Sequence, residues 1–470
     1  MEIIKIVLIF CMIVSGLTLY AQAYEIKVAG EKFSLKAERV PLQDILKNLA
    51  ERTGIIIRID PALNPKISAG FENRSLQQGL ESILKSLNHV LLWESIETPI
   101  GPMTRLKEIQ VFEPGRKDLM QDLGGARSLQ IARNPKDGSF YVKGEILVRL
   151  KSDTKFEAFY ALVERSGGSV AAVNRALGIY CLYWPPDTDI PALVQELLRQ
   201  PDISQAEPNF AYPISLPYRY NQSTSTNIDP NNATAPEGAV PVAVLDSGWT
   251  SNPELNDIIL ASLDAFDPDQ PISDDLGHGT QMAMLAAGIV KPYGVPGEAD
   301  TANPVIPVRT FDENGFTSNY SLMRGIDFAL QSGARVMSIS WGTQTQSAFL
   351  EDAFKYAASK GLIIVASAGN EPIGQAVYPA AFESVIGIGA LAPDGQKWQN
   401  SNFGDFVEMY APGFADMPVG YKGDPGMYAG TSIAAAFVAN QIAIFLSQNP
   451  KATKGEMLKA LQIANEIPSQ

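Results

Sequence analysis

Short apolar runs alternate with amphipathic segments throughout the second half of the chain. The runs are four residues long and almost wholly apolar, at 242–245, 336–339, 362–365 and 385–388. Runs of this kind are typical of strands buried on both faces, as in a parallel sheet. Segments with helical periodicity separate them, at 281–289, 321–330 and 348–358. The alternation predicts an α/β domain over residues 237–470, with a doubly wound, mostly parallel sheet.

Two small α+β domains are predicted before it. Over residues 24–115, strands at 33–37 and 54–59 flank an amphipathic helix, and Ser75 with Gln78 indicates a capping box that opens a second helix. Over residues 140–213, strands and helices follow in the order β-α-β-β-α-β, which indicates a split βαβ sandwich. Residues 214–236 have no apolar period and are predicted to be a linker, a plausible site of proteolytic cleavage.

The start of the chain has the pattern of an export signal. Lys5 precedes an apolar run over 6–17, and Ala21-Gln22-Ala23 follows as a small-residue cleavage pattern. The run is short for a membrane span, so we expect a signal peptide over residues 1–23, with an uncleaved N-terminal anchor as the alternative. After cleavage no stable membrane span is expected, and the protein would be periplasmic or extracellular. Only Cys181 would remain of the two cysteines, so no intrachain disulfide can form.

Charge is distributed unevenly between the two halves. Residues 237–470 hold 25 acidic and 11 basic side chains, whereas the rest of the chain holds 26 of each. The acidic half therefore accounts for the whole net charge of −14. Because such a surface repels phosphate backbones, nucleic acid is not expected as a partner.

Four polar residues stand where functional groups collect in a parallel sheet, at the carboxyl ends of strands or the starts of apolar helices. Asp246 follows the run 242–245, and Asn370 follows the run 362–365. His278, in Gly-His-Gly-Thr, and Ser432, in Gly-Thr-Ser, each open an apolar helix. A serine hydroxyl becomes nucleophilic when an imidazole accepts its proton, and a carboxylate holds that imidazole in the useful tautomer. A side-chain amide can stabilise the oxyanion.

Each of these signals is weak alone, but their order and separate motifs resemble the subtilisin family of serine proteases. The resemblance extends over nearly all of residues 237–470, including 305–309, 401–404 and 411–413. It implies Asp246, His278 and Ser432 as the catalytic triad and Asn370 as the oxyanion-hole residue. It also implies that Ser340-Trp341-Gly342 pairs with the substrate backbone, that Ala368 and Gly369 border the pocket before the scissile bond, and that the Tyr378–Pro379 bond is cis.

The chain departs from the family pattern at several positions. Ile433, Ala436 and Phe437 stand where the family usually has Met, Pro and His. None of these has a catalytic role, so we expect the mechanism to be retained. Trp341 is bulkier than the usual residue, which predicts a narrower substrate groove.

Two further resemblances concern the smaller domains. Residues 24–115 resemble the short N-terminal module of secretins and TonB-dependent receptors (STN-like), which contacts other envelope proteins; a structural extension of the precursor is the alternative. The segment Ala206-Glu207-Pro208-Asn209-Phe210 resembles the end of subtilisin-type propeptides, which template folding and lay their tail in the active site. A permanent regulatory domain is the competing interpretation.

No cofactor is required by the predicted chemistry. Five aspartates precede His278, at 264, 267, 269, 274 and 275, and oxygen-rich loops can hold Ca²⁺. Their spacing matches no recognised calcium loop, which favours a solvated acidic loop over a calcium site. The leading functional hypothesis is a secreted serine endopeptidase made as a proenzyme and acting on proteins or peptides. The alternative is a catalytically silent envelope scaffold that binds a partner through its STN-like module.

Overall fold

The computed structural model describes residues 24–29, 32–98, 101–123, 128–221, 235–251, 256–268, 270–295, 302–418 and 425–465. The predicted signal peptide lies outside these residues. The chain divides into two compact units. The first contains the described residues before Arg127 together with Phe156–Ser169 and Trp184–Pro186, and the second contains the remainder.

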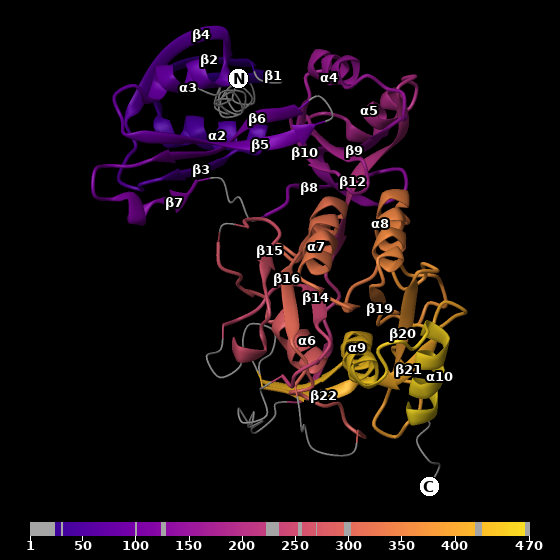
Figure 1. Cartoon of the computed structure of the whole chain (residues 1–470). Helices are drawn as coiled ribbons and strands as arrows, with labels where there is room; N and C mark the ends of the chain where they lie inside the picture. Colours follow the sequence, from indigo (N-terminus) through magenta and orange to yellow (C-terminus); the bar gives the residue numbers. More distant parts are fainter. Residues whose placement is uncertain are drawn as a thin grey trace, which may run out of the picture. The chain divides into compact units, whose positions relative to one another are not determined.

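The described residues of the first unit before Arg127 form two sheets and two amphipathic helices (Figure 1). One sheet has the strand order β1-β2-β4 (Tyr24–Ala29, Lys32–Pro41, Lys66–Ser75), and the other has the order β5-β6-β3-β7 (His89–Thr98, Gly101–Val111, Ile56–Ile59, Gln121–Asp122). The helices are α2 (Leu42–Thr53) and α3 (Leu76–Leu84). The predicted capping box is confirmed, because the Ser75 side chain accepts from Gln78 N while the Gln78 side chain accepts from Ser75 N.

The predicted β-α-β-β-α-β order is confirmed in the middle of the chain. It consists of β9 (Phe140–Leu150), α4 (Phe156–Arg165), β10 (Ser169–Asn174), β11 (Ile179–Tyr183), α5 (Ile190–Leu197) and β12 (Ile203–Pro213). The strands form the order β10-β11-β9-β12, with β8 (Ile131–Arg133) on β9. A short strand of the α/β domain, β17 (Phe316–Ser318), pairs with the free edge of β12. One sheet therefore joins these two parts of the chain.

The α/β domain is built on a seven-stranded parallel sheet, as predicted (Figure 1). Its order is β15-β16-β14-β18-β19-β20-β21: Leu263–Asp264, Val305–Arg309, Val242–Asp246, Val336–Ile339, Ile363–Ser367, Val385–Leu391 and Met409–Pro412. The domain's helices are α6 (His278–Ala287), α7 (Asn319–Gln331), α8 (Ala348–Ser359), α9 (Thr431–Gln448) and α10 (Lys454–Asn465). A smaller antiparallel sheet has the order β13-β23-β22 (Tyr218–Asn221, Gly426–Ala429, Phe414–Met417).

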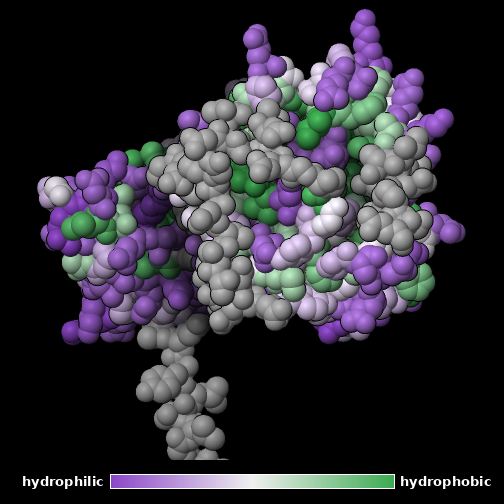
Figure 2. Space-filling view, turned by 90° about the horizontal axis from the view of Figure 1, so that it is seen from below, coloured by the Kyte–Doolittle hydropathy of each residue, from purple (hydrophilic) through white to green (hydrophobic). Residues whose placement is uncertain are grey.

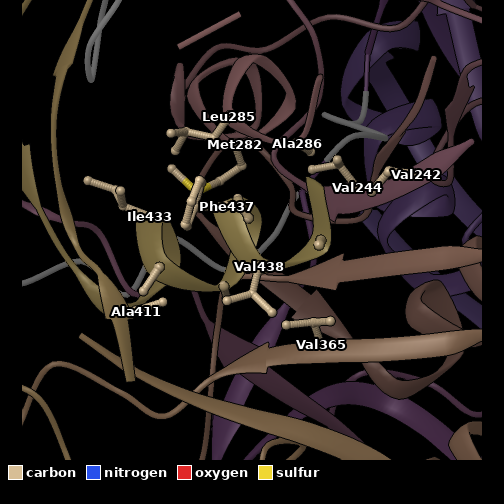
Figure 3. Packing of buried hydrophobic residues seen from close by; sticks show 14 of the residues in the cluster. Val242, Val244, Met282, Leu285, Ala286, Val365, Ala411, Ile433, Phe437 and Val438 are labelled. Atoms are coloured by element: carbon tan, nitrogen blue, oxygen red, sulfur yellow. The ribbon is translucent and has the colours of Figure 1, made fainter. Parts of the chain in front are cut away.

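Alternate residues of the central strand β14 point into two separate cores. Val242 and Val244 belong to the core that contains residues of α6 and α9, whereas Ala243 and Leu245 belong to the core that contains residues of α7 and α8. Both faces of the sheet are therefore covered, and this explains why the strand sequence lacks polar alternation. Figure 3 shows the first core, where Phe437 and Val438 of α9 lie among side chains of α6 and of the strands.

Helix α9 is long and apolar because it is a core helix. Within the described part of the chain it alone meets the length and hydropathy expected of a membrane-crossing helix, and 72% of its span is buried inside the domain. On the face shown in Figure 2, hydrophilic residues surround smaller groups of hydrophobic ones.

Candidate active site

Asp246 and His278 form a buried pair at the carboxyl edge of the sheet. Asp246 is the last residue of β14, and His278 is the first residue of α6. The Nδ1 atom of His278 lies 2.7 Å from Asp246 Oδ1, and each residue is only 1% exposed. Asp246 Oδ1 also accepts a hydrogen bond from the backbone N–H of Ser247. The carboxylate therefore fixes the imidazole tautomer in which Nδ1 carries the proton and Nε2 is free to accept one.

The turn before His278 is held by Asp274. Its carboxylate accepts hydrogen bonds from Gly277 N, Thr280 N, Thr280 Oγ1 and Ser247 Oγ, at 2.6–2.8 Å. Gly277 has a φ of 77°, which favours glycine. A Cβ on Gly279 would lie 2.5 Å from the carbonyl oxygen of Gly248, so this position also requires glycine. Asp274 thus acts as a positioning residue, which the sequence indicated only as one member of an acidic cluster.

Two opposing effects set the pKa of His278. Burial of the imidazole lowers its pKa, but the negative charge of Asp246, the hydrogen bond to it and the charge of Asp274 outweigh burial, so the net pKa is raised. Nε2 of His278 is buried and has no hydrogen-bond partner among the described residues. A basic imidazole with a free acceptor nitrogen is suited to take a proton from a nucleophile.

Ser432 and Asn370 come together at the start of α9. The amide oxygen of Asn370 accepts hydrogen bonds from Thr431 N and Thr431 Oγ1, both at 2.9 Å. Its Nδ2 group is therefore left as a buried donor without a partner in the described part of the chain. The Oγ atom of Ser432 donates to the carbonyl oxygen of Ser340 at 3.2 Å, just beyond β18. Ser432 is 1% exposed.

Trp341 is fully buried in this structure, where Tyr212 at the end of β12 covers its ring. The two rings stack with centroids 5.1 Å apart and an interplanar angle of 12°. The Trp341 side chain belongs to the core that also contains residues of α7 and α8. Because Tyr212 belongs to the propeptide-like domain, the effect of Trp341 on the width of the substrate groove stays a prediction.

The other predicted substrate-binding residues lie near the carboxyl edge of the parallel sheet. Gly342 precedes Thr343, which forms an antiparallel bridge with Tyr378, and the Tyr378–Pro379 bond is cis as predicted. Ala368 is fully buried. Gly369 has a φ of 102° and donates its backbone N–H to Thr431 Oγ1 at 3.2 Å.

The predicted solvated acidic loop is wrong for two of its aspartates. Asp264 is buried and pairs with the buried Arg309 at 2.8 Å, and Asp267 is only 6% exposed. Arg309 also lies 3.7 Å from Asp275. Asp269 lies outside the described residues, and in the rest no group of three or more acidic, histidine or cysteine residues could hold a metal ion. The acidity of this segment is therefore explained in part by an internal ion pair and by the turn before His278.

This geometry is that of a serine hydrolase on a doubly wound sheet, and the comparisons identify the family. The subtilase family matches residues 237–466, and the fervidolysin N-terminal prodomain matches residues 129–209. The chain is 30% identical to subtilisin E of Bacillus subtilis over 279 residues, covering 57% of this chain and 72% of the relative. It is 33% identical to subtilisin Savinase of Lederbergia lenta over 215 residues, covering 45% and 77%. The chain therefore belongs to the subtilase family of serine endopeptidases and carries a zymogen prodomain.

Two longer matches extend toward the N-terminus. A thermophilic serine proteinase of Bacillus sp. strain AK1 is 28% identical over 320 residues, which is 66% of this chain and 79% of the relative. The solved structure of fervidolysin from Fervidobacterium pennivorans, described as a keratinolytic enzyme related to subtilisin, has a TM-score of 0.55 and 24% identity. This match covers 71% of this chain and 59% of that one, and shows the shared fold. Family membership supports the peptidase hypothesis over the silent scaffold.

Proposed function

We propose that the chain is an exported endopeptidase that hydrolyses peptide bonds through an acyl-enzyme on Ser432. The observation that carries the proposal is a pair of buried atoms without a hydrogen-bond partner among the described residues: His278 Nε2 at the start of α6, and Nδ2 of Asn370, whose amide oxygen accepts from Thr431 beside Ser432. One is a proton acceptor and the other a hydrogen-bond donor. They are the two complementary groups that an attacking serine requires.

In the proposed reaction, the Ser432 hydroxyl leaves the carbonyl of Ser340 and its Oγ attacks the substrate carbonyl carbon. The proton passes to His278 Nε2, and the charge on the substrate oxygen is stabilised by Asn370 Nδ2 and the backbone N–H of Ser432. When the tetrahedral intermediate collapses, the peptide C–N bond breaks and His278 protonates the leaving amine. Water then attacks the ester with the same imidazole as base, releasing the acid product. No metal or cofactor is required for these steps.

The experiment compares the exported precursor with its Ser432→Ala variant. Intact mass and labelling by a serine-directed fluorophosphonate are followed over time. We expect label and cleavage in the wild type and neither in the variant. Ser338→Ala is the matched control, because Ser338 is an equally buried serine in the neighbouring strand β18. Absence of label on folded wild-type protein would overturn the proposal.

The pH dependence of the reaction provides an independent check. The imidazole must be neutral to accept the proton, and its pKa is raised in the folded protein. We therefore expect kcat/KM to increase with pH through a midpoint above the ordinary histidine pKa of about 6.5. A midpoint below that value would contradict the arrangement in which Asp246 and Asp274 outweigh burial.

We also propose that the precursor is exported by residues 1–23 and that the STN-like first unit contacts an envelope protein. Support comes from the sequence pattern of residues 1–23 and from the α+β arrangement of the first unit. Crosslinking in the envelope, with full-length protein and a variant lacking residues 24–115, tests the second part. Loss of a specific crosslinked species in the shortened variant is expected, and an unchanged pattern would argue for a purely structural extension.

A further inference from the structure

The chain crosses the candidate active site immediately after β12. The backbone N–H of Ile214 donates to the carbonyl oxygen of Gly315 at 2.8 Å, which continues the contact of β12 with β17. A few residues later, at Pro217, the chain passes close to Gly430. A Cβ placed on Gly430 would lie 3.2 Å from Pro217 Cβ and 3.5 Å from Asn370 Nδ2. Pro217 therefore lies next to Gly430, which precedes Ser432 by two residues and is also close to the proposed oxyanion donor.

Beyond Pro217 the chain becomes the strand β13, which pairs antiparallel with β23. Tyr218 lies opposite Ala429, and Arg219 lies opposite Tyr428. Strand β23 leads directly into Gly430 and the helix that carries Ser432. The segment therefore contacts β17 before the site and β23 after it. A substrate bound in the same direction would place its leaving-group side along β23.

The β13–β23 contact is aromatic on one face. The register of β13 against β23 is irregular between Arg219 and Asn221, but Tyr218 and Tyr220 both contact the same pair of adjoining rings. The Tyr218 ring lies 5.5 Å from the Trp398 ring in an edge-to-face arrangement, and the Tyr220 ring lies 5.4 Å from the Phe414 ring. The indole Nε1 of Trp398 donates to Tyr220 Oη at 3.2 Å. On the other side, Arg219 Nη2 donates to the carbonyl oxygen of Pro425.

The Trp398 and Phe414 rings are buried, whereas the Tyr218 and Tyr220 rings that lie against them are half-exposed. Trp398 is 3% and Phe414 7% exposed, while Tyr218 and Tyr220 are 46% and 43% exposed. The centroids of the Trp398 and Phe414 rings are 5.9 Å apart, and both residues belong to the main core of the α/β domain. This pair of rings, called the platform below, is thus part of the folded domain, and β13 is the peripheral strand that lies against it.

We propose that the edge of β23, with Trp398 and Phe414, is a peptide-binding site for the leaving-group side of substrates. It selects aromatic side chains at two positions separated by one residue, with tyrosine favoured over phenylalanine at the second. In the precursor the chain's own Tyr218–Asn221 occupies this site. The inference rests on the proposed function, since it assigns a specificity site for that reaction.

The chemistry of the site fits this ligand class. The edge of β23 offers backbone hydrogen bonds to any extended peptide, whereas the rings give the discrimination between side chains. Edge-to-face ring pairs contribute binding free energy beyond that of burial, and the indole N–H of Trp398 favours tyrosine by donating a hydrogen bond to the phenolic oxygen. After cleavage near Pro217 the strand would remain tethered through residues 222–234, so it would compete with added substrate at a high effective concentration.

The test uses the full-length protein after its own maturation and internally quenched peptides that differ only on the leaving-group side. One peptide has two tyrosines separated by one residue, a second has the same pair shifted by one residue, and a third has alanines. We expect one of the two tyrosine peptides to have a kcat/KM about tenfold higher than that of the alanine peptide. The other tyrosine peptide, in which the pair is displaced by one residue, should resemble the alanine peptide. Equal kcat/KM values for all three peptides would overturn the proposal. Because cleavage of the alanine peptide and fluorophosphonate labelling report Ser432 separately, failure of this site differs from failure of the proposed function.

Three variants assign the preference to the platform and to its occupant. Trp398→Ala is expected to bring the tyrosine-to-alanine ratio close to one, whereas Trp398→Phe keeps a preference for aromatic residues and loses that for tyrosine over phenylalanine. The control Trp93→Ala removes an exposed tryptophan of the first unit and keeps the full ratio. The double variant Tyr218→Ala/Tyr220→Ala removes the competing strand, so KM for the tyrosine peptide is expected to fall severalfold. A ratio unchanged in Trp398→Ala would overturn the assignment.

Discussion

The chain contacts the protease domain on both sides of Ser432, and the two contacts differ in kind. Before the site, β12 pairs with β17 and is also held by buried polar groups: Tyr212 Oη donates to Asn319 Oδ1 at 2.7 Å at the start of α7, and both residues are at most 1% exposed. After the site, β13 pairs with β23, and the half-exposed rings of Tyr218 and Tyr220 contact Trp398 and Phe414. The first contact is built like a protein interior and the second like a binding surface.

The difference indicates separate tasks for the two contacts. On the prodomain side, Glu207 accepts from Ser347 Oγ, and Asn209 Oδ1 accepts from Tyr320 N at 3.1 Å. Ser347 is the N-cap of α8, and Tyr320 lies in the first turn of α7. Prodomain side chains thus form hydrogen bonds at the starts of two helices of the protease domain, where backbone N–H groups have no acceptor within the helix. A contact of this kind supports folding, whereas the β13 contact can be exchanged for a substrate. Four predictions test this contrast.

The largest effect is expected from Tyr212→Ala. This change removes a fully buried ring that stacks on Trp341 and donates to Asn319, at an expected cost of about 3–5 kcal/mol. Hydrogen exchange of the backbone amides of residues 203–213, in a Ser432→Ala background that prevents cleavage, reports the free energy of opening. Tyr218→Ala is the comparison variant and should cost less than about 1 kcal/mol, because that ring is half-exposed. Equal costs would remove the distinction between the contacts.

The second effect depends on pH. Burial raises the pKa of Glu207 to about 7, although hydrogen bonds from Ser347 and from two backbone N–H groups lower it in part. The contact is therefore most stable while Glu207 is protonated, and it loses stability as pH increases from about 4.5 to about 7. The expected loss is at most about 3 kcal/mol.

The same exchange measurement at pH 5 and pH 8, corrected for intrinsic rates, provides the check. Glu207→Gln should remove most of the dependence, whereas residues 218–221, which contain no carboxylate or histidine, should show little. A contact that becomes more stable with increasing pH would contradict the assignment.

A smaller effect is expected from Asn209→Ala. Its side chain accepts from the buried start of α7 and donates to Glu145 Oε2 at 2.6 Å, so its removal leaves groups without their partner. The expected cost is about 1–3 kcal/mol, seen as faster exchange in the first turn of α7. Ser204→Ala is the control, since Ser204 is exposed.

The smallest effect is expected from Tyr220→Phe. The change keeps the ring on Phe414 and removes only the phenolic oxygen that accepts from Trp398. Opening of β13 should become easier by about 0.5–1.5 kcal/mol, with no change in residues 203–213. An effect as large as that of Tyr212→Ala would show that β13 is part of the folded core and not an exchangeable strand.

Sequence patterns were sufficient where burial alone decides the structure. The run 336–339 coincides with β18, and the predicted helix over 348–358 ends one residue before α8 does. The strand ends that carry Asp246 and Asn370 follow from the same pattern, because parallel strands bring their carboxyl ends together.

The sequence was insufficient where the partner lies far along the chain. Nothing in the sequence near Trp341 indicates that Tyr212, more than a hundred residues earlier, supplies its stacking surface. Residues 214–236 were predicted to be a linker, yet 218–221 form a strand. That strand is short and polar in pattern, and its stability comes from Trp398 and Phe414, which local periodicity cannot show.

The position of Ser432 on α9 links catalysis to the completeness of folding. This helix contacts α6 and five strands of the parallel sheet, and most of its residues are buried. The nucleophile therefore reaches its place only when the centre of the domain has consolidated around it. A nascent or damaged protease molecule in which this helix is not packed into the domain has no assembled catalytic site. It therefore cannot cleave other chains during the period when those chains are still folding.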